Sequence, residues 1–172
     1  MRPTFWHRLD SLARRLTPFG LTLILMLVGL MPFHMPEFAR VVPSLVVIAV
    51  YHWSIHRPTL LPASLVFLIG FLQDMLSGTP LGLNILILLT VYGVVLTQRR
   101  FFVNKSFAVV WLGFALVSAM ASVVGWILIS VFSLTLVSPN SMVVQYMITV
   151  GVFPLLSWSF SRWQQHFLAY EA

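Results

Sequence analysis

Long apolar runs alternate with short polar breaks along this chain, and the pattern predicts a bundle of membrane-spanning helices. A spanning α-helix needs about 20 mostly apolar residues, and the runs approach or exceed that length. Proline, glycine and charged residues mark the breaks. The six predicted spans are Thr17–Phe33, Phe38–Ile55, Thr59–Leu76, Leu81–Thr97, Ser106–Leu134 and Ser141–Phe160. The expected fold class is therefore all-α, a polytopic membrane protein with one six-helix transmembrane domain at 17–160.

Polar segments at 1–16 and 161–172 flank this domain as a basic N-terminus and a C-terminal tail. A basic segment before an apolar run is also the pattern of a secretory signal. The first run ends in Gly29–Pro36 without a small-residue cleavage site, so we expect an uncleaved span. The composition favours a membrane protein as well, because 8% of the 172 residues are charged, whereas soluble domains carry about 25%.

The distribution of charge predicts the orientation of the chain in the membrane. With a cytoplasmic N-terminus, the inside segments hold nine of the ten basic residues, and the outside segments hold only Arg40. The opposite orientation would violate the positive-inside rule. We therefore expect both termini in the cytoplasm. The net charge of +6 then reflects topology and calls for no nucleic-acid partner, although the inner face would attract anionic membrane lipid.

Groups that could carry catalysis or bind a metal are few. The chain has no cysteine, which excludes disulfides, thiolate ligands and cysteine nucleophiles. His52 and His56 are four residues apart and could share a helix face, but a metal site needs a further ligand. Serines such as Ser118 in the fifth span form no Ser–His–Asp set, because Asp74 and the histidines of the second span are expected at opposite faces of the membrane. We therefore expect no enzyme, no metal site and no cofactor.

Asp74 is the only acidic residue inside the predicted spans, near the end of the third. A charged side chain at the centre of a spanning helix costs about 2.5–3.5 kcal/mol. Candidate partners are Gln73, Asn84 and the free N–H groups at the start of the fourth helix, which favour an anion. We favour a role in bracing the turn Ser77–Gly82, and a proton or substrate site is the alternative. Bracing predicts near-normal function for Asp74→Asn and loss of accumulation or assembly for Asp74→Leu.

Small residues at intervals of four predict two close contacts between helices. Residues spaced by four share one helix face, and small side chains there let a neighbouring backbone approach. The first series is Gly70, Asp74 and Gly78, which share a face if the third helix continues as far as Gly78, and the second is Gly113, Val117, Ala121 and Gly125.

The most specific pattern in the chain is Gly70-x-x-x-Asp74-x-x-Ser77-Gly78-x-x-Leu81-Gly82. Before it, Pro43 opens a span that ends in Tyr51-His52-Trp53 and is followed by Arg57-Pro58. Near the end of the chain, Gly151-Val152-Phe153-Pro154 precedes Arg162. With these residues, its length and its six-span layout, the chain resembles the MreD family of bacterial rod shape-determining membrane proteins.

The resemblance implies a non-enzymatic inner-membrane component of the cell-elongation machinery, which regulates cell shape and peptidoglycan synthesis by scaffolding partners. The implied partners are an MreC-like membrane protein and, directly or indirectly, the actin-like MreB filament and RodA with its penicillin-binding protein. The resemblance also implies a fold similar to the substrate-binding subunits of energy-coupling-factor transporters. A subunit of such a transporter that binds a small molecule or lipid is therefore the alternative function. The residues expected to serve structure and interaction are Gly70, Asp74, Ser77, Gly78, Pro80, Gly82 and Asn84.

Overall fold

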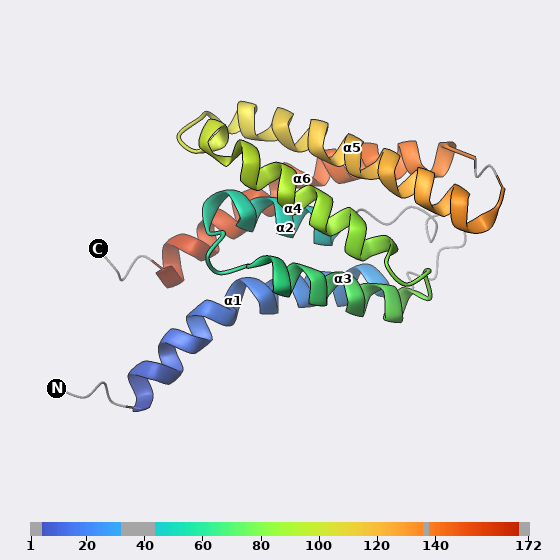
Figure 1. Cartoon of the computed structure of the whole chain (residues 1–172). Helices are drawn as coiled ribbons and strands as arrows, with labels where there is room; N and C mark the ends of the chain where they lie inside the picture. Colours follow the sequence, from blue (N-terminus) through green and yellow to red (C-terminus); the bar gives the residue numbers. More distant parts are fainter. Residues whose placement is uncertain (1–4, 32–43, 136–137, 169–172) are drawn as a thin grey trace.

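The computed structural model is a bundle of helices (Figure 1). It describes the backbone of residues 5–31, 44–135 and 138–168, and the side chains of 17–31, 44–135 and 138–163. Within these ranges the chain forms six α-helices and no β-strand. They are α1 (Phe5–Leu30), α2 (Leu45–His56), α3 (Ala63–Ser77), α4 (Leu83–Phe102), α5 (Phe107–Ser133) and α6 (Asn140–Leu168).

Among the residues with described side chains, three helices are long and apolar enough to cross a membrane, namely α4, α5 and the Asn140–Trp163 part of α6. The described apolar stretches in α1, α2 and α3 are shorter, with 10–17 residues each. The 12 residues of α2 rise only about 18 Å, less than the bilayer core of about 30 Å. The all-α class is thus confirmed, and three helices satisfy the criteria of length and composition for a span.

Several helix ends differ from the predicted bounds. α1 begins at Phe5, so the helix extends back through most of the basic segment that the sequence sets apart. α4 continues beyond Thr97 and includes Arg99 and Arg100 in its last turn. Basic side chains near a helix C-terminus interact favourably with its carbonyl end, so these charges do not stop the helix. The predicted start of the second span, including Pro43, lies outside the described residues.

α2 is the centre of the bundle. It contacts α1, α4, α5 and α6, and every residue from 46 to 55 is buried. The Tyr51 ring lies edge-on to Phe102 of α4, Phe114 of α5 and Phe153 of α6. Its hydroxyl donates a hydrogen bond to the carbonyl oxygen of Val110 in α5, at 2.9 Å. Tyr51 therefore connects the short central helix to three helices that follow it in the chain.

The small-residue series on α5 forms the close contact that its spacing predicts. Its four members are all buried. A Cβ atom at Gly125 would lie 3.1 Å from Cδ1 of Ile87 in α4, and one at Gly113 would overlap the Phe102 ring. This face of α5 therefore packs closely against α4.

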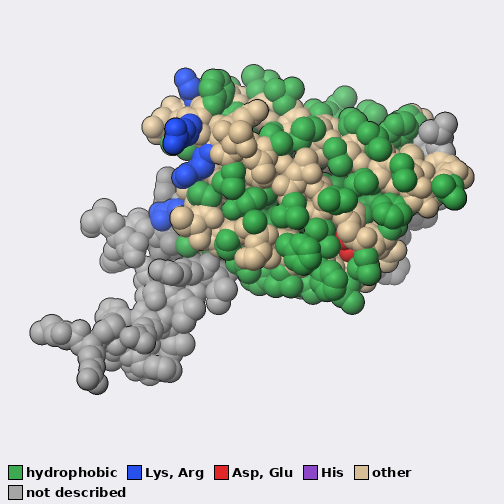
Figure 2. Space-filling view, in the orientation of Figure 1, with side chains coloured by type: hydrophobic (Ala, Val, Ile, Leu, Met, Phe, Trp, Pro, Cys, Tyr) green, Lys and Arg blue, Asp and Glu red, His purple; other side chains and the backbone are tan. Residues whose placement is uncertain are grey.

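The described charges lie at opposite ends of the bundle. Figure 2 shows the lysine and arginine side chains at one end and an acidic side chain near the other. The α2–α3 and α4–α5 connections, the first turn of α1 and the last turn of α6 lie toward the basic end (Figure 1). Asp74 is the only acid with a described side chain. The described basic side chains are Arg57, Arg99, Arg100, Lys105 and Arg162.

Candidate functional site

The chain reverses direction between α3 and α4 in a turn built from glycine and proline. Gly78 adopts a left-handed conformation (φ +65°), which commonly ends a helix, and α3 stops at Ser77. Pro80 has no N–H to donate, and its carbonyl oxygen accepts a 3.2 Å hydrogen bond from the Leu83 N–H. Gly82 is left-handed again (φ +103°) and immediately precedes α4. Two positions that favour glycine therefore fix where the two helices meet.

The end of α3 decides which small residues share its buried face. The helix does not continue as far as Gly78, so Gly78 does not share a face with Gly70 and Asp74. Gly70 and Asp74 are both buried on α3. A Cβ at Gly70 would lie 2.8 Å from the Cα of Ile85 and 3.0 Å from its backbone nitrogen. The backbone of α4 therefore rests directly on Gly70.

The carboxylate of Asp74 is the centre of a hydrogen-bond cluster, and the residue is 1% exposed. Its Oδ1 accepts from the Thr79 hydroxyl at 3.0 Å, the Asn84 backbone N–H at 2.9 Å and the Asn84 Nδ2 at 2.8 Å. Its Oδ2 accepts from the Gly82 N–H at 2.8 Å. All four donors come from the turn and the start of α4. Asp74 thus joins the last turn of one helix to the first turn of the next.

These contacts explain how an acid can be buried at this position. The first N–H groups of a helix have no partners within that helix and carry partial positive charge. A hydrogen bond to a charged group contributes roughly 1.5–3 kcal/mol, which offsets the desolvation of the carboxylate. The arrangement is a structural anchor, since every contact satisfies a donor of the neighbouring turn.

Two of the three expected partners of Asp74 are in place, and one prediction is wrong. Asn84 and the N–H groups at the start of α4 bind the carboxylate. Gln73 does not, because the donors to the carboxylate belong to Thr79, Gly82 and Asn84. Thr79 was not predicted as a partner, since its hydroxyl reaches Asp74 only because the turn folds back. Ser77 is exposed.

The two histidines that the sequence singles out, His52 and His56, lie in α2, toward the basic end of the bundle. The His52 and His56 rings stack with their centroids 4.3 Å apart, and the His56 Nδ1 lies 2.9 Å from the His52 carbonyl oxygen. Among residues with described side chains, no group of three or more His, Cys, Asp or Glu could hold a metal ion. The Ser118 hydroxyl donates to the Ala115 carbonyl oxygen at 3.2 Å. The structure therefore brings none of these residues together with Asp74.

The helical bundle, its three long apolar helices and its apolar outer surface (Figure 2) define an all-helical integral membrane protein. The family model for rod shape-determining protein MreD matches residues 10–169. The chain therefore belongs to the MreD family, as its motif indicated, and has a role in the bacterial rod-shape machinery. No curated protein and no solved structure matches it. The alternative of a transporter subunit finds no support in these comparisons.

Proposed function

We propose that the protein serves rod-shape determination as a non-enzymatic scaffold that holds partner proteins of cell elongation together and thereby regulates peptidoglycan synthesis. The observation that carries this proposal is the Asp74 cluster, which fixes α3 and α4 as one rigid hairpin. A rigid element can present a constant surface to a partner. Both oxygens of the Asp74 carboxylate are occupied by donors of the turn, which suits a structural role better than chemistry.

The outer face of this hairpin is the surface that we propose for partner contact. Phe67, Phe71 and Met75 are spaced by four on α3 and are 47%, 36% and 61% exposed. The Phe67 and Phe71 rings stack at 6.5 Å. Helices in a membrane associate through packing, so an apolar stripe on a fixed helix can receive a partner's spanning helix. We assign an MreC-like membrane protein to this surface.

The proposed membrane arrangement has six spans, with both termini in the cytoplasm of the cell and the protein in the inner membrane. The described basic side chains at one end of the bundle support it, because positive charge favours the cytoplasmic side (Figure 2). The Asp74 turn then lies near the outer face. In this arrangement the basic end would contact the MreB filament, directly or through the MreC-like partner. RodA and its penicillin-binding protein would be contacted within the membrane, again directly or through that partner.

Depletion of the protein in its own rod-shaped host should make the cells round. Re-expression of the wild-type chain should restore the ratio of cell length to width, measured by phase-contrast microscopy. A variant that accumulates in the membrane but fails to restore cell shape would show that the presence of the protein alone is not sufficient for its function. Cells that remain normal rods after clean deletion would contradict a role in shape.

Photo-crosslinking tests the proposed partner surface. A benzophenone amino acid at Met75 should form a crosslinked band with the MreC-like protein in intact cells, detected by immunoblot. The matched control is the same amino acid at Leu116 of α5, which is 75% exposed and lies on another helix. Equal crosslinking at both positions, or none at Met75 while tagged protein still co-purifies the partner, would place the contact elsewhere.

A further inference from the structure

A cavity of about 420 Å³ lies in the half of the bundle that contains Asp74. Residues from all six helices line it, and its volume falls within the range of about 300–1,000 Å³ that is typical of ligand sites. It is located at the start of α2, where Ser44, Leu45, Val46 and Val47 contribute to the lining. Because α2 is short, the helices around it enclose space beside its first turn.

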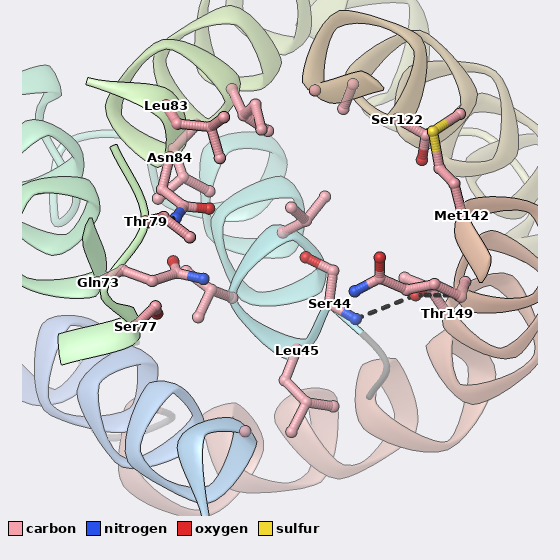
Figure 3. A pocket seen from close by; sticks show the side chains of 18 of the residues that line it. Ser44, Leu45, Gln73, Ser77, Thr79, Leu83, Asn84, Ser122, Met142 and Thr149 are labelled. Atoms are coloured by element: carbon pink, nitrogen blue, oxygen red, sulfur yellow. Dashed lines mark hydrogen bonds between the residues drawn. The ribbon is translucent and has the colours of Figure 1, made fainter. Parts of the chain in front are cut away.

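The lining of this cavity is polar on two sides and carries no charge among its described residues. Figure 3 shows Gln73, Thr79 and Asn84 on one side, with Ser122 and Thr149 across from them. Apolar residues of α1, α4 and α5 complete the wall. A buried charge needs a partner of opposite sign, and the described residues of the lining offer none. They favour a ligand that is uncharged, forms hydrogen bonds and has an apolar part.

The Asp74 cluster orients one of the polar groups in the wall. The Asn84 Nδ2 donates to the Asp74 Oδ1 at 2.8 Å and to the Thr79 hydroxyl oxygen at 3.2 Å. The Thr79 hydroxyl donates to Asp74 in turn. These bonds use the amide nitrogen of Asn84 and leave its amide oxygen for the cavity, which it lines.

Gln73 supplies a donor to the same cavity. Its Oε1 is fully buried without a hydrogen-bond partner and does not face the cavity, whereas Figure 3 shows its amide nitrogen on the cavity side. A hydroxyl group both donates and accepts, so it can bond to the Asn84 amide oxygen and to the Gln73 amide nitrogen. The two amides therefore favour a hydroxyl-bearing ligand.

We propose that the cavity binds the uncharged, hydroxyl-bearing part of an amphipathic molecule, with its hydroxyl groups on the Asn84 amide oxygen and the Gln73 amide nitrogen and its apolar part on the Leu, Ile and Met side chains of the lining. The headgroup of a neutral glycolipid and a free glycoside share this chemistry. The inference involves no transport and is independent of the scaffold role.

Cysteine protection tests the proposal, because the chain has no cysteine of its own. Ser122→Cys places a single thiol in the lining, and Ser133→Cys places one on the exposed end of the same helix as the matched control. Each variant is reconstituted in vesicles of phosphatidylethanolamine and phosphatidylglycerol. The measurement is the rate of N-ethylmaleimide labelling with n-octyl-β-D-glucoside below its solubilising concentration, with methyl-β-D-glucoside, and with the zwitterionic octylphosphocholine.

Octyl glucoside should slow the labelling of Ser122→Cys by about threefold at twice its dissociation constant and leave Ser133→Cys unchanged. Slowing by octyl glucoside alone indicates a lipid source for the natural ligand, and slowing by methyl glucoside as well indicates that the sugar suffices. Equal protection by octylphosphocholine would overturn the proposal, because it would show an unselective apolar pocket. Failure of both glucosides to protect would overturn it too.

Gln73→Leu, made in the Ser122→Cys background, separates ligand recognition from folding. Because the Gln73 oxygen has no partner within the protein, leucine should leave the unfolding midpoint unchanged or raise it. The same change should raise the octyl glucoside concentration for half-protection by about tenfold, through the loss of a hydrogen-bond donor. Unchanged half-protection, or a lowered midpoint that accounts for the weaker protection, would refute the assignment.

Discussion

Replacing Asp74 with leucine is expected to remove most of the protein from the membrane. Four donors lose their acceptor together, and two of them are backbone N–H groups of Gly82 and Asn84. Each buried donor left unpaired costs about 1–3 kcal/mol, against a total stability of about 5–15 kcal/mol for a typical domain. Immunoblots of membrane fractions and thermal unfolding of the purified remainder in detergent measure the effect. Wild-type accumulation of Asp74→Leu would show that α3 and α4 meet without the cluster.

The stability of Asp74→Asn should lie between those of the wild type and Asp74→Leu. The structure changes the expectation from the sequence at this point. Size and polarity suggested near-normal function for Asp74→Asn. All four partners are donors, however, and an asparagine amide offers one acceptor oxygen and an amino group that itself donates. The amino group of the asparagine must then face either the Gly82 N–H or the three donors that bind Oδ1 in the wild type. Two donors facing each other leave a hydrogen bond unmade, which should cost about 1–3 kcal/mol of stability. Thr79→Ser, which keeps the hydroxyl, is the matched control, and equal midpoints for Asp74→Asn and wild type would refute the account.

Gly70→Ala should destabilise the protein by about 3 kcal/mol, near the upper end for overpacking. The added Cβ would lie 2.8 Å from the Cα of Ile85, and a backbone atom within a helix cannot turn aside as a side chain can. α3 and α4 would have to separate, which would also stretch the hydrogen bonds from Gly82 and Asn84 to Asp74. The measurement is the unfolding midpoint in detergent, with the yield of folded protein.

Gly93→Ala is the matched control for this prediction. Gly93 lies in the interior of α4, and a Cβ there would have no neighbouring atom within 4 Å. Alanine is favoured over glycine in a helix by about 1 kcal/mol, so this variant should be neutral or more stable. Similar midpoints for Gly70→Ala and Gly93→Ala would mean that the α3–α4 contact is looser than the structure shows.

The sequence could predict the helices and part of the Asp74 cluster because both follow from local physics. Uncharged apolar runs specify helices, and the N–H groups at a helix start attract a nearby acid. Thr79 could not be found in this way, since its position depends on the left-handed conformations of Gly78 and Gly82. Gln73 was misassigned because adjacent residues on a helix point about 100° apart, so it lines the cavity while Asp74 faces the turn.

Helix ends and the cavity were beyond the reach of the sequence. Charge alone does not end a helix, as Arg99 and Arg100 in the last turn of α4 show. The central position of α2 could not be predicted either, because an apolar run has the same composition whether lipid or protein surrounds it. The cavity wall is assembled from all six helices, so no single segment carries a signal for it.

The burial of α2 has a consequence for folding during synthesis of the chain. α2 leaves the ribosome after α1 but before the other helices that it contacts, α4, α5 and α6, and the acceptor of the Tyr51 hydroxyl, Val110, is in α5. Phe114 and Phe153, which pack on the same ring, are in α5 and α6. A chain whose synthesis stops after α3 therefore has a short helix that lacks every aromatic and hydrogen-bond partner of Tyr51 named above. We expect such a fragment to be degraded faster than the full chain, because its central helix is left without three of its packing partners.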